Sequence, residues 1–428
     1  DTKSDGVKLA YDLTPDHTVT FQYDWMDSKY NGQDLIYIGP YNGRHKSRMW
    51  SLTDDWKVDD HWRNKLTYRN NRLETRYGKP LGEGNSQGTV SAPYSVSSDM
   101  NYDFLSNQVE FTDACNTLVF GVDYSKARSL DGQHPMGFDE DGDAIYGDRS
   151  MKNHSYYIQD DWKLSPAITL SGGLRHDKPN GDGSSPNMDS HTSKSYKLSF
   201  DLTKKDTFYA GRSDFYILPS LYQLYDEKYG NADLCPAEGR TTTIGYARKF
   251  GEKDLLTVNW FETESERSIG YSSSGQYQNF RNGISRGWNA QYTKQINDNW
   301  NFRFGWAHLF ANEGAGDTFS LGYYPKDMAT FLIGYNKDKF GAAVDGFYFI
   351  RRTNPVNSDV RGWPSNKYGV YNLSMDYAPT KQMKFYLKVD NIFDKLWAEH
   401  TDVIWNGVPG SWYSQPGRTI TLGVQYKF

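Results

Sequence analysis

The chain has 428 residues, of which 37% are hydrophobic, and it carries a formal net charge of −5. This charge balance, without a basic cluster along the chain, argues against a nucleic-acid partner. No run of residues approaches the roughly 18 consecutive apolar positions of a transmembrane helix. Aromatic residues nevertheless make up 16% of the chain, with 33 Tyr and 13 Trp. Such an excess at low mean hydropathy is typical of a transmembrane β-barrel, in which half of each strand faces water.

Runs in which polar and apolar residues alternate recur along the whole chain, and each run predicts a β-strand with one apolar and one wet face. Short turns and long polar loops alternate between these runs. We therefore predict an all-β fold, a transmembrane antiparallel up-and-down β-barrel over residues 1–428. Nineteen strands are predicted, at residues 6–13, 18–30, 48–57, 61–77, 101–112, 117–127, 153–164, 167–176, 193–202, 207–217, 242–250, 255–266, 280–295, 300–309, 328–335, 340–350, 368–377, 383–390 and 418–428.

The run at residues 117–127 shows how the two faces are assigned. Leu118, Phe120, Val122 and Tyr124 fall on one side, and Asp123 falls on the other. A Lys or Arg on the lipid side at mid-depth would cost roughly 2–4 kcal/mol. The uninterrupted apolar side is therefore predicted to face lipid, and Asp123 is predicted to face inward.

The last run, residues 418–428, reads RTITLGVQYKF and alternates strictly up to the final aromatic residue. A terminal strand with one apolar face becomes an aggregation site unless both of its edges are held. The economical solution is a closed barrel in which this strand pairs with the first strand of the ring.

The order of short and long connections predicts the direction of each strand. Outer-membrane barrels have short periplasmic turns and long extracellular loops, so the first and the last predicted strands both run toward the periplasm. A complete barrel that begins and ends in the periplasm has an even number of strands. We therefore expect an odd number of strands, most economically three, before Asp1. The total of twenty-two is the size of plugged outer-membrane transporters.

Four segments stand out as longer sequence motifs. They are YYIQDDWKLSPAITLSGGLRHD at residues 156–177, FYILPSLYQLYDEKYGNADLCPAEG at 215–239, NFRNGISRGWNAQYTKQI at 279–296, and DNIFDKLW followed by PGRTITLGVQYKF. These segments resemble the TonB-dependent outer-membrane receptors, and they occur in the order found in that family. The resemblance covers the barrel portion of such a receptor, because no plug domain and no TonB box are visible in the chain.

The resemblance implies an active transporter of the bacterial outer membrane that imports a scarce, bulky nutrient such as a ferric siderophore, haem or cobalamin. The implied partners are a plug domain (upstream or on a separate chain), a TonB-type energy-transducing protein, a small-molecule metal chelate, and outer-membrane lipids with lipopolysaccharide. No cofactor is required. No nucleophile and base occur in a recognisable triad or elbow context, so we predict no catalytic residue and no enzymatic activity.

Aromatic residues in the long loops are the candidates for contact with the solute, because an aromatic ring offers a large area with one polar handle. The alternative for each is a place in the interfacial girdle of the barrel. Arginines such as Arg351 and Arg352 could bind an anionic chelate or lipopolysaccharide. The candidate substrate-binding residues are Tyr37, Tyr41, Arg44, Phe138, Tyr146, Tyr222, Tyr271, Tyr324, Trp363, Trp405 and Trp412.

The acidic loop sequence FDEDGDAIYGD places Asp139, Asp141 and Asp143 at alternate positions. Carboxylates with this spacing can ligate calcium in an extracellular loop, although the EF-hand pattern is incomplete and a solvated acidic loop is the alternative. His134 and His400 lie in long loops and are candidate haem ligands, or ordinary loop residues.

The two cysteines are predicted to lie on opposite sides of the membrane, Cys115 in a short turn and Cys235 in a long loop. A barrel wall about 25 Å tall separates these positions, whereas a disulfide needs Cα atoms within about 7 Å. We therefore predict that the two are not bridged.

Three other functions remain open from the sequence. The barrel could serve as a passive pore or a surface adhesin, it could be the barrel half of a split receptor whose plug is a separate chain, or the chain could be a soluble sugar-binding β-protein. A plug and a TonB-binding stretch upstream of Asp1 would favour active transport over a pore, and extraction without detergent would favour the soluble protein.

Overall fold

The computed structural model describes residues 2–34, 39–78, 95–131, 149–181, 188–225, 229–272, 275–314, 325–351, 367–401 and 412–427. Strands dominate, and one short helix accompanies them. The elements are β1 (Thr2–Thr14), β2 (His17–Asp34), β3 (Gly39–Lys57), β4 (Trp62–Gly78), β5 (Ser95–Thr112), β6 (Asn116–Asp131), β7 (Arg149–Ser165), β8 (Ile168–Gly181), β9 (His191–Asp201), β10 (Asp206–Ile217), α1 (Leu221–Tyr225), β11 (Ala237–Lys249), β12 (Leu255–Tyr271), β13 (Tyr277–Gln295), β14 (Trp300–Glu313), β15 (Pro325–Lys337), β16 (Phe340–Arg351), β17 (Lys367–Tyr377), β18 (Met383–Asp390), β19 (Ala398–Thr401), β20 (Trp412–Ser414) and β21 (Thr419–Tyr426).

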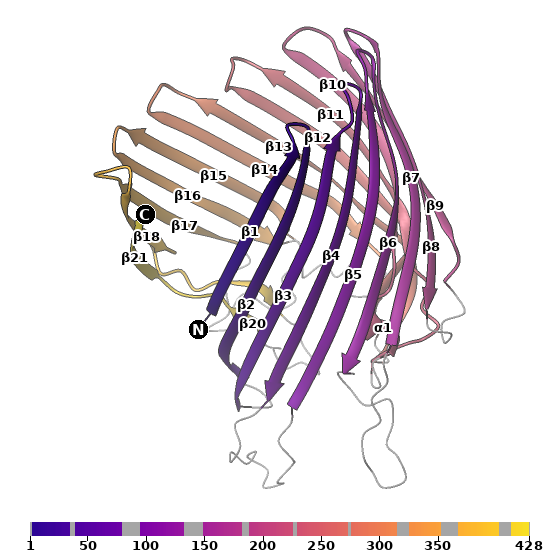
Figure 1. Ribbon diagram of the computed structural model, residues 1–428. Coiled ribbons are helices and arrows are strands. Elements are labelled where there is room, and N and C mark those ends of the chain that lie inside the picture. The colour runs from indigo at the N-terminus through magenta and orange to yellow at the C-terminus, as the bar shows by residue number, and fades with distance from the viewer. Residues whose placement is uncertain are drawn as a thin grey trace, which may run out of the picture.

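Each strand pairs antiparallel with the next from β1 to β18, and β21 pairs with β18. The result is a 19-stranded sheet, beside which β19 and β20 form a separate two-stranded sheet. The sheet curls into a ring with the short turns at one end (Figure 1). The up-and-down barrel fold predicted from the sequence is thereby confirmed.

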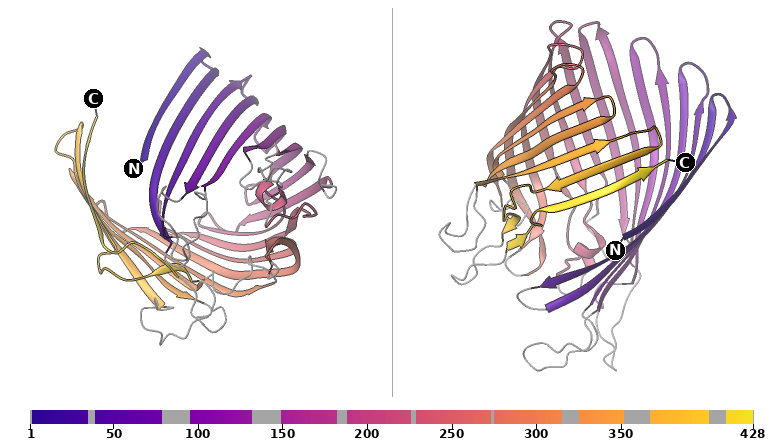
Figure 2. Two further views of the ribbon diagram at one scale, coloured as in Figure 1. Left: turned by 90° about the horizontal axis from the view of Figure 1, so that it is seen from below. Right: turned by 90° about the vertical axis from the view of Figure 1, so that its left-hand side faces the viewer.

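The ring has a gap between its first and last strands (Figure 2). Within the described residues, β1 pairs only with β2, and β21 pairs only with β18. Apolar side chains at both edges are exposed, Leu9 at 62% and Leu422 at 77%. Because β21 does not pair with β1, these nineteen strands do not close the barrel by themselves, and the full barrel size stays a prediction.

The wall has an apolar outer face and a polar inner face, as the alternation predicts. Phe120 and Val122 are exposed on the outer side of β6, at 38% and 48%. Asp123 points to the inner side, where its carboxylate accepts a hydrogen bond of 2.9 Å from Arg175 Nη1. The predicted faces of this strand are thus confirmed.

Aspartates build the short turns. The Asp59 carboxylate accepts hydrogen bonds from the backbone N–H groups of His61 and Trp62, at 2.7 and 2.8 Å. The Asp113 carboxylate accepts two bonds of 2.7 Å from Cys115 and Asn116 in the same way. These N–H donors stabilise the ionised form and hold the pKa of both carboxyl groups below the usual range. A side chain that satisfies two turn amides explains why so short a connection forms here.

The structure departs from the sequence expectation at the loop end of the strands. The β2–β3 ladder continues to the pair Asp34 and Gly39, far beyond the expected boundaries at residues 30 and 48. Backbone hydrogen bonds carry the ladder past the region where side-chain polarity alternates, so periodicity could not detect it. Helix α1 and the β19–β20 hairpin also lie in stretches expected to be loops. No helix among the described residues is long and apolar enough to cross a bilayer.

Candidate functional site

The connection between β10 and β11, described at residues 218–225 and 229–236, folds onto the inner side of the wall at the loop end (Figure 2). We call it the inner loop. It begins with a reciprocal pair of hydrogen bonds, in which Ser220 N–H donates to Gln223 Oε1 (2.9 Å) and Gln223 N–H donates to Ser220 Oγ (3.2 Å). This is the capping arrangement that starts a helix, and it sets the direction of α1.

Apolar side chains anchor the inner loop to the wall. Leu221, Leu224 and Leu234 pack together with Met151 of β7 in the buried apolar cluster of the chain. Leu234 is completely buried, at 0% exposure, and Leu224 is 2% exposed. Each fully buried leucine stabilises such an arrangement by roughly 1.5–3 kcal/mol.

Hydrogen bonds attach the other end of the inner loop to β13. Cys235 N–H donates to Asn279 Oδ1, and Asn279 Nδ2 donates back to the Cys235 carbonyl, both at 2.8 Å. Asn231 Nδ2 donates to the Tyr277 carbonyl at 3.0 Å. Because α1 lies against β6 and β7, the loop reaches from that part of the wall to β13. It therefore narrows the loop-side entrance to the lumen.

Four tyrosines meet where the inner loop joins the β12–β13 hairpin. The ring centroids are 6.0 Å apart for Tyr222 and Tyr277, 5.5 Å for Tyr271 and Tyr277, and 5.7 Å for Tyr229 and Tyr271. All three contacts are edge-to-face, a favoured geometry for aromatic pairs. This tyrosine cluster presents rings and hydroxyl groups together at the entrance.

A second aromatic cluster lies on the inner side of β16 and β17. The Trp397 ring is 5.4 Å from that of Phe347 and 5.9 Å from that of Tyr368, centroid to centroid. Tyr368 is only 3% exposed. Asn391, which has a positive φ of 52°, holds the turn that brings Trp397 back to the wall, because its Nδ2 donates to the Lys395 carbonyl at 2.9 Å.

The structure places three of the predicted substrate-binding residues. Tyr222 and Tyr271 are brought together through Tyr277 in the tyrosine cluster. Arg44 instead lies on the outer face of β3, where it forms a two-fold hydrogen-bonded ion pair with Asp27. The side chains of Tyr41, Trp412, Arg351 and His400, and the whole of Tyr37, Phe138, Tyr146, Tyr324, Trp363, Trp405, Arg352, His134, Asp139, Asp141 and Asp143, lie outside the described residues.

Five aromatic residues of the two clusters were missed by the sequence analysis: Tyr229, Tyr277, Phe347, Tyr368 and Trp397. Phe347 and Tyr368 lie in the predicted strands 340–350 and 368–377, so the search for loop aromatics passed over them, and Tyr277 lies just before the predicted start of its strand at residue 280. Tyr229 lies in a segment that contained the better-placed Tyr222. The one usable signal was the density of tyrosines in residues 222–229 and 271–277.

The described part of the chain contains no group of three or more His, Cys, Asp or Glu side chains placed to hold a metal ion. Cys115 and Cys235 are free thiols. The tyrosine cluster joins the inner loop to the β12–β13 hairpin, whereas the second cluster packs on the inner side of β16 and β17.

Comparisons with known proteins agree with this architecture. The family described as TonB dependent receptor-like, beta-barrel matches residues 2–392. A search of curated proteins gave no match. Among solved structures, a mutant of the ferric enterobactin receptor PfeA from Pseudomonas aeruginosa has a TM-score of 0.77 at 16% identity, over 100% of this chain and 69% of that one.

Two further structures show the same fold. The siderophore receptor PirA from Acinetobacter baumannii has a TM-score of 0.76 at 15% identity, over 100% of this chain and 71% of that one. The copper transporter OprC has a TM-score of 0.75 at 18% identity, over 100% of this chain and 72% of that one. At such low identity these similarities establish the fold alone, whereas the family match spans most of the sequence. The chain therefore belongs to the TonB-dependent receptor family, and residues 2–392 correspond to the β-barrel of that family.

Proposed function

We propose that the chain forms the wall of an active transporter in the bacterial outer membrane, and that this transporter imports a metal chelate such as a ferric siderophore. The observation that carries the proposal is the family match over residues 2–392. The similar structures include two siderophore receptors and a copper transporter, which favours a metal-containing solute. Haem and cobalamin are metal chelates of the same broad class.

The inner loop and the two aromatic clusters supply the geometry for capture. The rings of the tyrosine cluster combine apolar area with hydroxyl groups at the edge, which suits a bulky, partly aromatic chelate. The wall itself stays rigid, and movement of the solute requires work from an energised partner. A TonB-type protein that pulls on a plug domain is the partner that this family implies.

We also propose that a plug domain and about three further strands complete the ring and fill the lumen. The unpaired edges of β1 and β21 support the extra strands. The inner wall near the short turns supports a polar plug, because it is hollowed there by a cavity of about 680 Å³ lined by Lys8, Asp55, Arg63 and Lys65, among others. The mass and N-terminal sequence of the protein extracted from native membranes would test this.

Uptake by whole cells tests the proposed transport. Cells that carry this protein as their one receptor for ferric chelates should accumulate radioactive iron, supplied as a catecholate or hydroxamate chelate, above its external concentration. Accumulation should stop when the TonB-type protein is deleted, because a passive wall cannot concentrate a solute. Mass spectrometry of the compound that co-purifies from native membranes would identify the chelate.

Three results would contradict active transport. Uptake that persists without the TonB-type protein would indicate a passive pore. Attachment to surfaces without any uptake would indicate an adhesin. Extraction of the protein without detergent would place it outside the membrane altogether.

The free cysteines test the orientation of the barrel. Cys115 is exposed in the turn between β5 and β6, which we expect to face the periplasm. In a Cys235→Ser variant, a membrane-impermeant maleimide should leave Cys115 unlabelled in intact cells and label it once the outer membrane is opened. Labelling in intact cells would mean that the barrel is inserted the other way round.

A further inference from the structure

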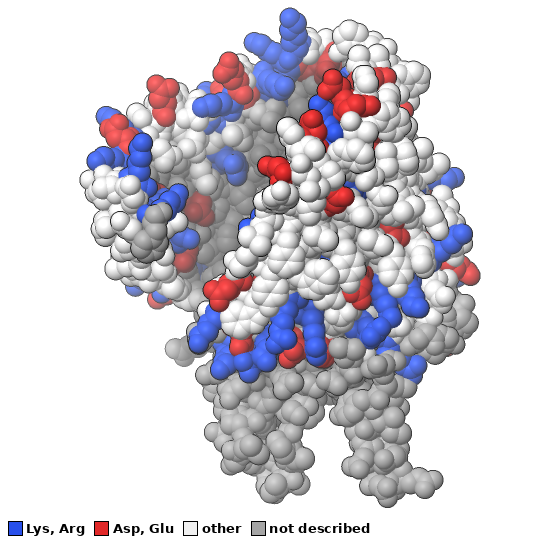
Figure 3. All heavy atoms as spheres, viewed as in Figure 1, with Lys and Arg blue, Asp and Glu red and all other residues white. Residues whose placement is uncertain are grey.

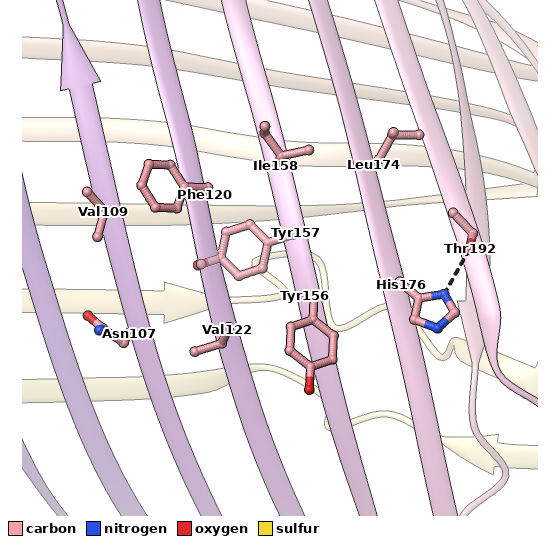
Figure 4. Close-up of a pocket in the computed structure, with 11 residues that line it drawn as sticks. Asn107, Val109, Phe120, Val122, Tyr156, Tyr157, Ile158, Leu174, His176 and Thr192 are labelled. Carbon is pink, nitrogen blue, oxygen red and sulfur yellow. Dashed lines mark hydrogen bonds between the residues drawn. The ribbon is translucent and has the colours of Figure 1, made fainter.

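The middle of the outer wall is mostly uncharged, with Lys and Arg side chains gathered next to the loops (Figure 3). Lipid explains the lack of charge on this outer face. Apolar side chains such as Phe120, Ile158 and Leu174 line a groove there (Figure 4). The inner face is polar instead, because it borders the lumen. A sector of inner wall without charged groups therefore needs an explanation of its own.

A row of hydroxyl side chains crosses five strands of the inner face. Arg175, which reaches Asp123 on the inner side, lies opposite Ser193 in the β8–β9 ladder. Ser195 is two residues further along β9 and so shares that face. Because partners in an antiparallel ladder share a face, the row continues along the lumen wall to β13. From Ser195 the direct partners are, in order, Ser213, Thr241, Thr263 and Ser285.

Among the described residues, no charged side chain occupies the inner-facing positions of β10 to β13 around this row. We call these positions the neutral sector. They are Thr207, Tyr209, Gly211, Ser213, Phe215, Gly239, Thr241, Thr243, Gly245, Ala247, Thr257, Asn259, Phe261, Thr263, Ser265, Ser285, Gly287, Asn289, Gln291 and Thr293. Other parts of the inner face carry ion pairs, Arg63 with Asp55 and Arg175 with Asp123. The neutral sector is therefore a local feature of the lumen wall.

Aromatic rings in the neutral sector lie flat against the wall. Each ring covers the glycine directly opposite it in the ladder, so that a Cβ on that glycine would meet the ring. The pairs are Tyr209 over Gly245, Phe215 over Gly239, and Phe261 over Gly287. The Tyr209 hydroxyl donates to Asn259 Oδ1 on the next strand but one, which holds the ring across the wall. Glycine in a strand often marks such a close approach, and here it makes the sector smooth as well as neutral.

The neutral sector begins directly below the inner loop. The loop leaves β10 at Ile217, four residues beyond Ser213, and joins β11 at Ala237, four residues before Thr241. Four residues of extended strand span about 13 Å. The tyrosine cluster lies at the same end of β12 and β13. A solute that leaves this cluster toward the short turns therefore meets the neutral sector on the same strands.

A hollow of about 330 Å³ lies at the β9 side of the neutral sector. Hydroxyl side chains line it, among them Ser195, Ser213 and Thr243, and no carboxylate of the described residues does. Lys197 is also part of the lining, and its Nζ lies 5.0 Å from the centre of the Tyr209 ring. An anionic solute is therefore not repelled here, and it meets many hydrogen-bond donors.

We infer that the neutral sector is the part of the lumen wall along which the imported solute moves, and that it suits an anionic chelate whose metal is surrounded by oxygen atoms. Hydroxyl and amide groups can donate hydrogen bonds to such oxygens. Neutral hydrogen bonds are roughly half as strong as charge-assisted ones, so the solute passes from group to group without being trapped. The inference rests on the proposed import function and adds which wall the solute follows.

A single charge placed in the neutral sector tests the inference. Asn289→Asp replaces one nitrogen by oxygen, and the new carboxylate can still accept the 3.1 Å hydrogen bond from Asn259 Nδ2. The initial rate of uptake of iron, supplied as an anionic catecholate chelate, should fall about threefold to tenfold, because like charges repel. Binding of the chelate to cells without the TonB-type protein should stay as in the parent, because capture precedes passage through the lumen.

Two matched controls separate the effect of charge in this sector from other effects. Asn71→Asp makes the same change on the inner face of β4, where Ser47 Oγ donates to Asn71 Oδ1 at 3.3 Å, and uptake should stay as in the parent. Ser213→Asp should slow uptake, whereas Ser213→Asn, which has the same size without the charge, should not. Heat-dependent mobility on a gel would verify folding of every variant.

Thiol labelling locates the open path without reference to the solute. The parent for this measurement carries Cys115→Ser and Cys235→Ser, which remove both native thiols. A membrane-impermeant maleimide should label Ser213→Cys in intact cells several-fold faster than Asn71→Cys. Deletion of the TonB-type protein should abolish this difference, because the path opens only when the energised partner acts.

Equal uptake by Asn289→Asp and Asn71→Asp, or by Ser213→Asp and Ser213→Asn, would overturn the inference. Labelling of Ser213→Cys no faster than that of Asn71→Cys would also overturn it, and would mean that a plug surface covers the neutral sector. A parent that takes up no iron would contradict the proposed function instead. The labelling would still decide which wall borders the opening, so the two proposals can fail separately.

Discussion

Replacing Gly239 by valine is expected to destabilise the folded barrel by about 1–3 kcal/mol or more. Gly239 follows a register shift in the β11–β12 ladder. A Cβ at this position would lie 2.2 Å from the Glu264 carbonyl oxygen and 2.6 Å from the Phe215 ring. The ring can turn aside, but the carbonyl belongs to the neighbouring backbone. The two strands would therefore have to separate, and the ladder between them would lose hydrogen bonds.

The expected size follows from the cost of overpacking, about 1–3 kcal/mol for a well-packed site, to which broken ladder bonds add. We expect the folded-to-unfolded ratio to fall about tenfold or more, which would be measured as a lower urea concentration at the midpoint of unfolding, followed by heat-dependent mobility on a gel. Gly172→Val is the matched control, because a Cβ at Gly172 meets nothing within 4 Å. Valine also suits a strand better than glycine, so this control should fold at least as well as the parent.

Equal folding of the two valine variants would contradict this reading of β11 and β12. It would mean that the wall can open locally around residue 239 without loss of the barrel. Reduced folding of Gly172→Val alone would mean that the outer face near β8 is not open to lipid.

Replacing Leu234 by aspartate is expected to release the inner loop while leaving the wall intact. The Leu234 side chain has 0% exposure and packs with Leu221, Leu224 and Met151. An unpaired carboxylate in this position costs several kcal/mol, and the roughly 1.5–3 kcal/mol that the buried leucine supplies is lost as well. The loop should therefore leave its site rather than bury the charge.

Limited proteolysis of the assembled barrel measures this release. Chymotrypsin cleavage within residues 218–236 should accelerate on the order of tenfold or more, because proteolysis tracks the population of the opened segment. Leu202→Asp, in an exposed turn where Leu202 is 58% accessible, makes the same chemical change and should leave the cleavage rate unaltered.

The same two variants also test whether the inner loop takes part in capture of the solute. If it contributes to capture of the solute, the Leu234→Asp barrel should bind a ferric chelate more weakly than the Leu202→Asp barrel, although both are folded. Unchanged cleavage in the Leu234→Asp variant would show that the apolar cluster does not hold the loop in place.

Much of the barrel wall was predictable because the relevant physics is local. Alternation at residues 117–127 reflects one apolar and one wet side, and the structure places Phe120 and Asp123 on those sides. Short turns were equally readable, since Asp59 and Asp113 satisfy amides two and three residues away. The strand ends at the loops could not be predicted, because the ladder hydrogen bonds continue there although polar and apolar side chains no longer alternate.

The candidate site was only partly predictable. Tyr222 and Tyr271 could be named as loop aromatics, but their meeting through Tyr277 joins positions far apart in the chain. That contact depends on the inner loop turning into the ring, which in turn depends on burial of Leu234 against the wall. No local pattern distinguishes a loop that folds inward from one that extends into solvent.

The charged side chains of the wall show the same division. Along the sequence the cations are scattered and no cluster is visible, and Lys126 and Lys152 are separated by a long loop. Strand pairing sets them directly opposite one another. The sequence by itself determined the strands, their faces and their turns, because period-two alternation and Asx turns act over a few residues. Only the tertiary structure decided which aromatic rings and which cations become neighbours, because register and ring curvature are set by the whole sheet.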